Sequence, residues 1–189
     1  MDMAARKRGR PKDAYGALLR SITGQQLSVK AAASIYGRLT EYFGGGTPSP
    51  AQLLAADPEE MRAAAGLSNA KVRYLRDLAE HVESGELDLA RLPELSDEDV
   101  SAALTEVKGL GEWTAHMFLI FHLERPDVLP VGDLGVRRAI ERAYGLDDMP
   151  GPEDMRRLAE PWRPWRSVAS LYLWRSLDNT PGEPRSSGA

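Results

Sequence analysis

The chain has 189 residues, of which 42% are hydrophobic and 28% are charged, with a formal net charge of −4 and no cysteine. This composition is ordinary for a globular protein, and the lack of cysteine excludes disulfide bonds, a thiol nucleophile, cysteine-ligated zinc and iron–sulfur clusters. No apolar run approaches about 18 residues and no signal peptide is recognisable, so we expect no membrane partner and a cytoplasmic location, associated with the nucleoid in a bacterium.

The first twelve residues form a polar segment with five basic residues and one acidic residue. Because Gly9 and Pro11 interrupt this segment, we interpret residues 1–12 as a disordered basic arm. Its Arg8-Gly9-Arg10-Pro11 sequence is the core of an AT-hook, which enters A·T-rich minor grooves. A solvated tail that attracts phosphates without sequence preference explains the same residues.

Apolar residues recur at helical spacing along most of the remaining chain, and no stretch alternates with the period of a strand. The predicted helices cover residues 14–22, 28–42, 51–55, a stretch that begins at 57, 69–83, 100–107, 112–123, 134–144 and 163–177. The helix at 112–123 is apolar almost all round, which predicts a buried central helix. After residue 179 the chain is polar and rich in Gly, Ser and Pro, which is typical of a disordered tail. We predict an all-α fold.

The segment 96–123 reads as a helix, a tight glycine turn and a second helix. Gly109 and Gly111 leave no side chain between the backbone and a ligand, and the unpaired amide groups at the start of the second helix favour an anion such as a phosphate. Thr114 offers a hydroxyl donor to the same group. A helix–helix turn that simply needs glycine would give the same residues.

Five blocks, in order, resemble the helix-hairpin-helix DNA glycosylases, specifically the alkylpurine (3-methyladenine type II) branch. The blocks are 22–28, 66–68, 107–115, 131–135 and 164–167. The resemblance spans residues 15–177 and implies two helical lobes around a cleft within a domain covering 13–178, with the tail at 179–189. Many members of the branch begin with a mixed α/β domain, which we expect to be missing here because the sequence goes almost directly to the helical part.

The resemblance implies that Asp133 is the catalytic carboxylate. On local sequence alone, Asp133 follows Pro130-Val131-Gly132 and precedes an amphipathic helix, which is the place of a helix N-cap. The two roles are compatible. Cleaving an N-glycosidic bond develops an oxocarbenium-like sugar, which one carboxylate stabilises while it orients water. An alkylated purine already carries positive charge, so it leaves without a general acid.

The resemblance also assigns the base pocket. Bifunctional members of the superfamily carry a lysine, which forms a Schiff base with the sugar, where this chain has Trp113. The substitution predicts base release by water without strand cleavage. Trp113 can stack on a flipped, electron-poor base, with Met117 one turn further and Trp174 as a second pocket tryptophan. Packing in the core is the alternative for both tryptophans.

Two further assignments come from the resemblance alone. The wedge that fills the space of a flipped base would be Gln26, with Leu27 as the alternative, although an ordinary interhelical loop would look the same. Backbone carbonyls of Thr105, Val107 and Leu110 would hold a monovalent cation, Na⁺ or K⁺, at the hairpin. No other cofactor is required.

We therefore predict a monofunctional glycosylase that removes 3-methyladenine or 7-methylguanine from double-stranded DNA by base flipping, acting as a monomer. A net charge of −4 argues against a polyanionic partner, but nine arginines between residues 125 and 175 allow a basic surface near the site. One alternative is a glycosylase for uracil, hypoxanthine or an etheno adduct. Another is a helix-hairpin-helix DNA-binding module without catalysis.

Overall fold

The computed structural model describes residues 11–178, and over this range it contains α-helices and two short 3-10 helices but no strand. The all-α prediction is confirmed. The chain separates into two compact units, one ending at Glu124 and the other beginning at Arg125, which agrees with two helical lobes. The predicted tail and nearly all of the basic arm fall outside the described residues.

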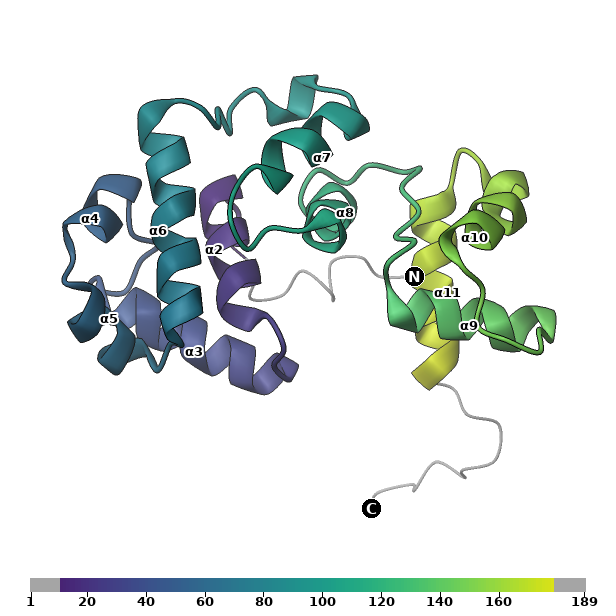
Figure 1. Cartoon of the computed structure of the whole chain (residues 1–189), viewed down its shortest axis with the longest axis horizontal. Helices are drawn as coiled ribbons and strands as arrows, with labels where there is room; N and C mark the ends of the chain where they lie inside the picture. Colours follow the sequence, from purple (N-terminus) through teal and green to yellow (C-terminus); the bar gives the residue numbers. More distant parts are fainter. Residues whose placement is uncertain (1–10, 179–189) are drawn as a thin grey trace, which may run out of the picture. The chain divides into compact units, whose positions relative to one another are not determined.

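The first unit contains seven α-helices among the described residues (Figure 1). They are α2 (Ala14–Gly24), α3 (Val29–Tyr42), α4 (Pro50–Ala55), α5 (Pro58–Ala65), α6 (Asn69–Ser84), α7 (Asp97–Thr105) and α8 (Glu112–Phe121), with the 3-10 helix η1 (Leu92–Glu94) before α7. Helix α2 packs between α3 and α6, α4 packs on α6, and α7 packs on α8. The core consists of fully buried leucines and isoleucines such as Leu18, Ile22, Leu75 and Leu78.

Local chemistry explains where these helices begin. The hydroxyl of Ser68 accepts a hydrogen bond from the Lys71 amide, and Asp57 accepts two from the first turn of α5, as expected of N-caps. Helix α7 begins directly after its cap Ser96, three residues before the predicted start at residue 100. The prediction placed the start too late because it counted the three acidic residues after Ser96, which form the first turn of α7, as part of the cap.

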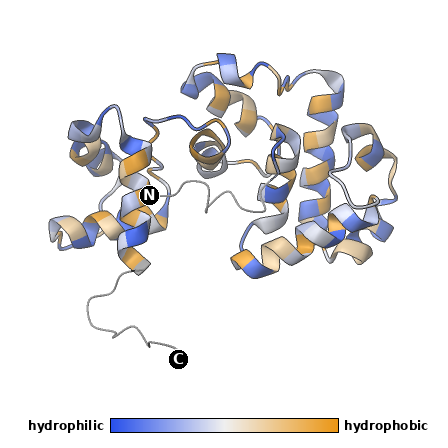
Figure 2. Ribbon diagram, turned by 180° about the vertical axis from the view of Figure 1, so that it is seen from behind, coloured by the Kyte–Doolittle hydropathy of each residue, from blue (hydrophilic) through white to orange (hydrophobic). Residues whose placement is uncertain are grey.

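Helix α8 only partly meets the expectation of a buried central helix. The residues from Thr114 to Ile120 are buried or half-buried, whereas Glu112 and Trp113 in the first turn are exposed. Figure 2 shows α8 as predominantly hydrophobic and α6 as a mixture of hydrophobic and hydrophilic residues. The exposed first turn leaves the N-terminal end of α8 accessible.

The second unit contains α9 (Leu134–Tyr144), α10 (Pro152–Ala159), the 3-10 helix η2 (Glu160–Trp162) and α11 (Arg166–Asp178). The sequence analysis missed α10, in which four of the eight residues are charged. It also began α11 at residue 163, which is wrong, because η2 occupies residues 160–162 and Pro164 has no N–H to continue a helix through that point.

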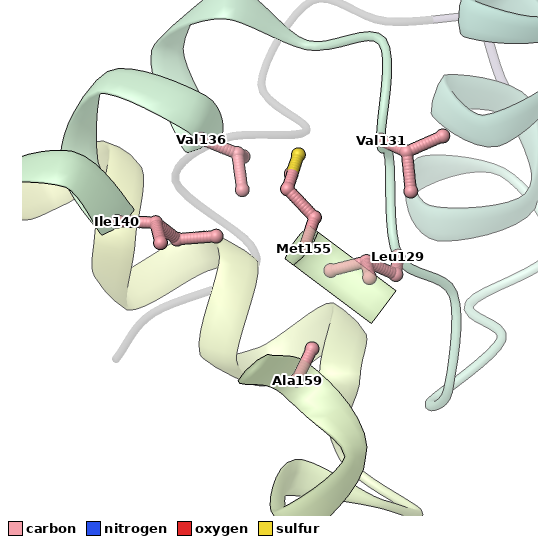
Figure 3. Close-up of a cluster of buried hydrophobic side chains, with 6 residues drawn as sticks. All are labelled: Leu129, Val131, Val136, Ile140, Met155 and Ala159. Atoms are coloured by element: carbon pink, nitrogen blue, oxygen red, sulfur yellow. The ribbon is translucent and has the colours of Figure 1, made fainter. Parts of the chain in front are cut away.

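Six residues form the hydrophobic core of the second unit, namely Leu129, Val131, Val136, Ile140, Met155 and Ala159. Figure 3 shows Met155 of α10 between Val136 on α9 and Val131 on the segment that precedes α9. The chain is therefore anchored in this core on both sides of Asp133. None of the helices in the part of the chain that the structure describes is long and apolar enough to cross a membrane.

Candidate functional site

The glycine turn between α7 and α8 is a hairpin closed by its own backbone. The Leu110 amide donates to the Val107 carbonyl at 3.0 Å, and Gly109 has φ of +87°, in the left-handed region that glycine adopts without cost. Gly111 is the N-cap of α8, and among the described residues no side chain caps this helix. No capping side chain therefore competes for the start of α8, where a bound phosphate stays a prediction.

Helix α6 holds the hairpin in place. Asp77 is 7% exposed. Its carboxylate accepts a hydrogen bond from the Lys108 amide at 2.8 Å and forms an ion pair with Lys108 Nζ at 2.7 Å. Burial raises the pKa of Asp77, but the hydrogen bonds and positive charge of Lys108 lower it by more, so the carboxylate stays ionised. One turn earlier on α6, the ring of Tyr74 lies so close to Gly109 that no Cβ fits between them.

The predicted wedge residues lie on the loop between α2 and α3. Gln26 is exposed and has φ of +60°, a conformation that is unusual outside glycine. Leu27 is 40% exposed. The side-chain amide of Gln25, the residue before the wedge, donates to the Gly109 carbonyl at 2.6 Å. The loop and the hairpin are therefore in direct contact.

Two predicted pocket residues occupy one face of α8. Trp113 is 44% exposed and Met117 is half-buried, and residues four apart share a helix face. Thr114 is buried, with 4% of its surface exposed, so its contribution to a phosphate site stays a prediction. The exposure of Trp113 argues against the alternative that it only fills the core of this unit.

In the second unit Asp133 caps α9, as its local sequence indicated. Its Oδ1 atom accepts the Val136 amide at 2.8 Å, and the residue is 9% exposed. The same Oδ1 atom accepts a hydrogen bond from the indole N–H of Trp174 at 2.8 Å. Space around this pair is limited, because a Cβ at Gly135 would lie 3.0 Å from both the Trp174 ring and Asp133 Oδ1. The carboxylate is thus held in a fixed orientation at the positive end of the α9 dipole.

Trp174 is therefore bound to the predicted catalytic carboxylate. The residue also packs against the hydrophobic core of the second unit, so the alternative of core packing is correct for part of its surface. Its role as a second wall of the base pocket stays a prediction.

The block at 164–167 receives a structural explanation. Arg166 donates to both carboxylate oxygens of Asp127, at 2.7 and 3.0 Å, and to the Asp127 carbonyl at 2.8 Å. Arg163 adds a third cationic donor at 2.8 Å. The Ser167 hydroxyl donates to the Arg125 carbonyl at 2.7 Å and accepts the Val128 amide at 2.9 Å. These contacts fasten the segment that leads to Asp133 onto α11.

Sequence reasoning missed Lys71, Asp77 and Asp127 as parts of the site. Asp77 gave no signal, because its spacing from Val72, Leu75 and Ala79 places it on the opposite side of α6 from the apolar stripe. Lys71 and Asp127 also gave none, because both looked like ordinary surface charges.

No group of three or more His, Cys, Asp or Glu residues within the described range is arranged to hold a metal ion. The predicted cation ligands Thr105, Val107 and Leu110 are backbone carbonyls of the hairpin. The turn that carries them is closed by the hydrogen bond between Leu110 and Val107, and neutral carbonyls of one turn suit a monovalent cation. The cation site stays a prediction.

Comparison with known proteins identifies relatives of this chain. The family model of the HhH-GPD superfamily base excision DNA repair protein matches residues 19–164. A putative DNA-3-methyladenine glycosylase of Bacillus subtilis, YfjP, is 34% identical over 170 residues, which are 87% of this chain and 59% of the relative. The chain thus spans about three fifths of the length of that relative.

Two solved structures are similar in fold. The DNA-3-methyladenine glycosidase of Bacillus halodurans has a TM-score of 0.78 and 41% identity, covering 87% of this chain and 75% of its own. The 3-methyladenine DNA glycosylase Mag1 of Schizosaccharomyces pombe, solved in complex with abasic DNA, has a TM-score of 0.80 and 34% identity, covering 89% and 82%.

Proposed function

The chain belongs to the HhH-GPD superfamily of base excision DNA repair proteins, and from this premise we propose that it is a monofunctional DNA glycosylase that removes alkylated purines from double-stranded DNA. The relatives described above carry the names of 3-methyladenine glycosylases or glycosidases, and one of them was solved in complex with abasic DNA. The observation that carries the proposal is the Asp133 carboxylate, buried and oriented by Val136 and Trp174.

In the proposed reaction the N-glycosidic bond of a flipped nucleotide breaks and leaves positive charge on the deoxyribose. The Asp133 carboxylate stabilises that charge and orients the attacking water. An alkylated purine such as 3-methyladenine or 7-methylguanine is cationic before the bond breaks, so it departs with the bonding electrons as a neutral base and needs no acid. A proposed site with one carboxylate and no general acid therefore suits alkylated purines, which are already cationic.

Trp113 supports hydrolysis without strand cleavage. A bifunctional enzyme needs an amine at this position to form a Schiff base with the sugar, and an indole cannot do so. An exposed tryptophan can instead stack on a flipped base, most favourably on a cationic one. Base release should therefore leave an intact strand with an abasic site.

Binding to DNA is assigned to the first unit. The amide groups at the start of α8 would hold a backbone phosphate, and Gln26 or Leu27 would enter the stack in place of the flipped nucleotide. A monovalent cation on the Thr105, Val107 and Leu110 carbonyls would add positive charge beside that phosphate. We expect one chain to act as a monomer.

The experiment compares wild type with Asp133→Asn on duplexes that carry a single defined lesion, followed by alkali to cleave abasic sites. Asparagine retains an oxygen that can accept from Val136 and Trp174, so the fold and the cap are kept. We expect wild type to release 3-methyladenine and 7-methylguanine, and Asp133→Asn to release neither while binding DNA equally well. The matched control is Asp57→Asn, the same change at the cap of α5, which should leave base release unchanged.

Four results would redirect the proposal. If Asp133→Asn releases bases as fast as wild type does, the Asp133 carboxylate takes no part in the mechanism. DNA binding without base release by wild type would indicate a binding module, and release of uracil, hypoxanthine or an etheno adduct in preference to alkylpurines would indicate another lesion. Strand cleavage before alkali would contradict the argument from Trp113.

A further inference from the structure

Helix α6 touches both DNA-facing elements of the first unit along one stripe. Lys71, Tyr74 and Asp77 follow one another at intervals of three residues, which places them on neighbouring parts of one helix face. Tyr74 and Asp77 contact the hairpin at Gly109 and Lys108. Lys71 contacts the wedge loop. The stripe therefore joins two elements that lie far apart in the sequence.

The Lys71 side chain caps the C-terminal end of α2. Its ammonium group donates to the carbonyl of Thr23 at 2.8 Å and to that of Gln25 at 3.0 Å. A cation is favourable at this place, because the last carbonyls of a helix carry partial negative charge and have no partner within the helix. The contact fixes the backbone of Gln25 relative to α6.

Gln25 completes the connection through its side chain. Its Nε2 atom donates to the Gly109 carbonyl at 2.6 Å, across 84 positions of sequence. Gly109 is also the residue against which Tyr74 packs. Gln25 is therefore fixed at its carbonyl by α6 and at its side chain by the hairpin.

The next residue in the chain is Gln26, the proposed wedge, in a left-handed conformation with φ of +60°. Such a conformation costs about 1 kcal/mol or more in a residue other than glycine and persists only where its surroundings impose it. On its other side, Ser28 is fixed as the cap of α3. Gln25 and Ser28 thus hold the exposed tip of the loop from both ends.

We propose that Gln25 is a positioning residue that locks the wedge loop to the hairpin, so that binding of a phosphate at α8 and insertion of Gln26 into the base stack occur as one event. This inference rests on the proposed function. It predicts that Gln25 matters for the recognition of DNA in which a base is missing from the stack, and much less for the attraction of intact duplex, which depends on charge.

The test uses the whole 189-residue chain and two duplexes of the same sequence, one intact and one with a tetrahydrofuran abasic analogue. We compare wild type, Gln25→Ala, Gln26→Ala and the double variant. A 2-aminopurine opposite the analogue reports insertion of the wedge through its fluorescence. The control is Gln52→Ala, which removes the same side chain from an exposed capping box on α4 and should change neither binding nor fluorescence.

We expect wild type to prefer the abasic duplex, and Gln25→Ala to lose about tenfold of that preference, as the loss of one hydrogen bond of about 1.4 kcal/mol would give. Affinity for the intact duplex should change less than about twofold. The double variant should lose no more than the larger of the two single losses, because a wedge that is out of position has nothing left to contribute.

Additive losses, or equal losses on both duplexes, would overturn the inference, and so would a wild type without preference. The readout is independent of base release. If wild type releases no base yet prefers the abasic duplex in a manner that depends on Gln25, the proposed function fails and the coupling stands. If wild type releases alkylpurines and Gln25→Ala keeps the full preference, the coupling fails and the proposed function stands.

Discussion

Adding one methyl group to Gly109 should mainly reduce stability, whereas the same change at Gly111 should mainly reduce affinity for DNA. In Gly109→Ala the residue must keep φ of +87°, which costs about 1–2 kcal/mol for an L-residue. The new Cβ would also overlap the Tyr74 ring, and overpacking of this kind costs about 1–3 kcal/mol. We therefore expect Gly109→Ala to lower the free energy of unfolding of the first unit by about 2–5 kcal/mol.

Gly111→Ala provides the matched comparison. Gly111 has φ of −97° and ψ of 174°, which any residue adopts, and a Cβ there would meet no heavy atom within 4 Å. Its stability cost should remain below about 1 kcal/mol, the usual penalty for alanine at an N-cap. The methyl group would, however, stand beside the amides proposed to hold a phosphate, so affinity for DNA should fall about tenfold.

Urea unfolding followed by circular dichroism measures the first effect, and fluorescence titration with duplex DNA measures the second. The reasoning is refuted if the two variants lose equal stability, since the structure then gives the wrong account of why Gly109 is glycine. If Gly111→Ala binds DNA as tightly as wild type does, the amide groups at the start of α8 do not contact the DNA.

Three further predictions concern the contacts around the site. The folded-state pKa of Asp77 is lowered, because Lys108 outweighs the effect of burial; the carboxylate therefore contributes stability above its unfolded pKa of about 3.9. That contribution is lost as pH falls through the lower folded value, so the stability difference between wild type and Asp77→Asn should shrink below about pH 4 in urea unfolding. Trp174→Phe removes a hydrogen bond to the Asp133 carboxylate and should lower kcat for base release about 10- to 100-fold with KM unchanged. Arg166→Lys cannot reproduce the two-pronged ion pair and should destabilise the second unit by about 1.5–3 kcal/mol in thermal unfolding.

Each of these has its own contradicting result. A stability difference for Asp77→Asn that stays constant from pH 7 to pH 2 would mean that the ion pair contributes nothing. A rise in KM at constant kcat in Trp174→Phe would make the tryptophan a binding surface and not a positioning group. An unchanged unfolding midpoint in Arg166→Lys would show that one ammonium is sufficient there.

The helices were readable from the sequence because their signals are local. The helices predicted to begin at residues 57 and 69 start at the caps Asp57 and Ser68, and the apolar spacing located most of the helices. Helix α10 escaped because its short amphipathic stretch is dominated by charge, although Gly151 and Pro152 mark its start. The cap role of Asp133 was also visible locally.

The contacts that build the site were not readable in the same way. The hydrogen bond from Trp174 to Asp133 joins residues 41 positions apart, and that from Gln25 to Gly109 joins residues 84 apart. No periodicity or spacing encodes which distant donor meets which acceptor, because tertiary packing decides it. Resemblance to a family supplied the candidate residues, and the structure supplied their partners.

The stripe on α6 has a consequence for how this chain tolerates insertions and deletions. One residue added between Lys71 and Asp77 would turn the rest of the helix by about 100°. The Lys108 amide would then face a different side chain while the wedge loop kept its old partner. Insertions at exposed positions of the connection between α6 and α7, which follows Gly85 and buries only Leu87 and Leu92, would leave both contacts in register. We therefore expect length variation among related chains to accumulate after Gly85 and to be excluded from the stretch between Lys71 and Asp77.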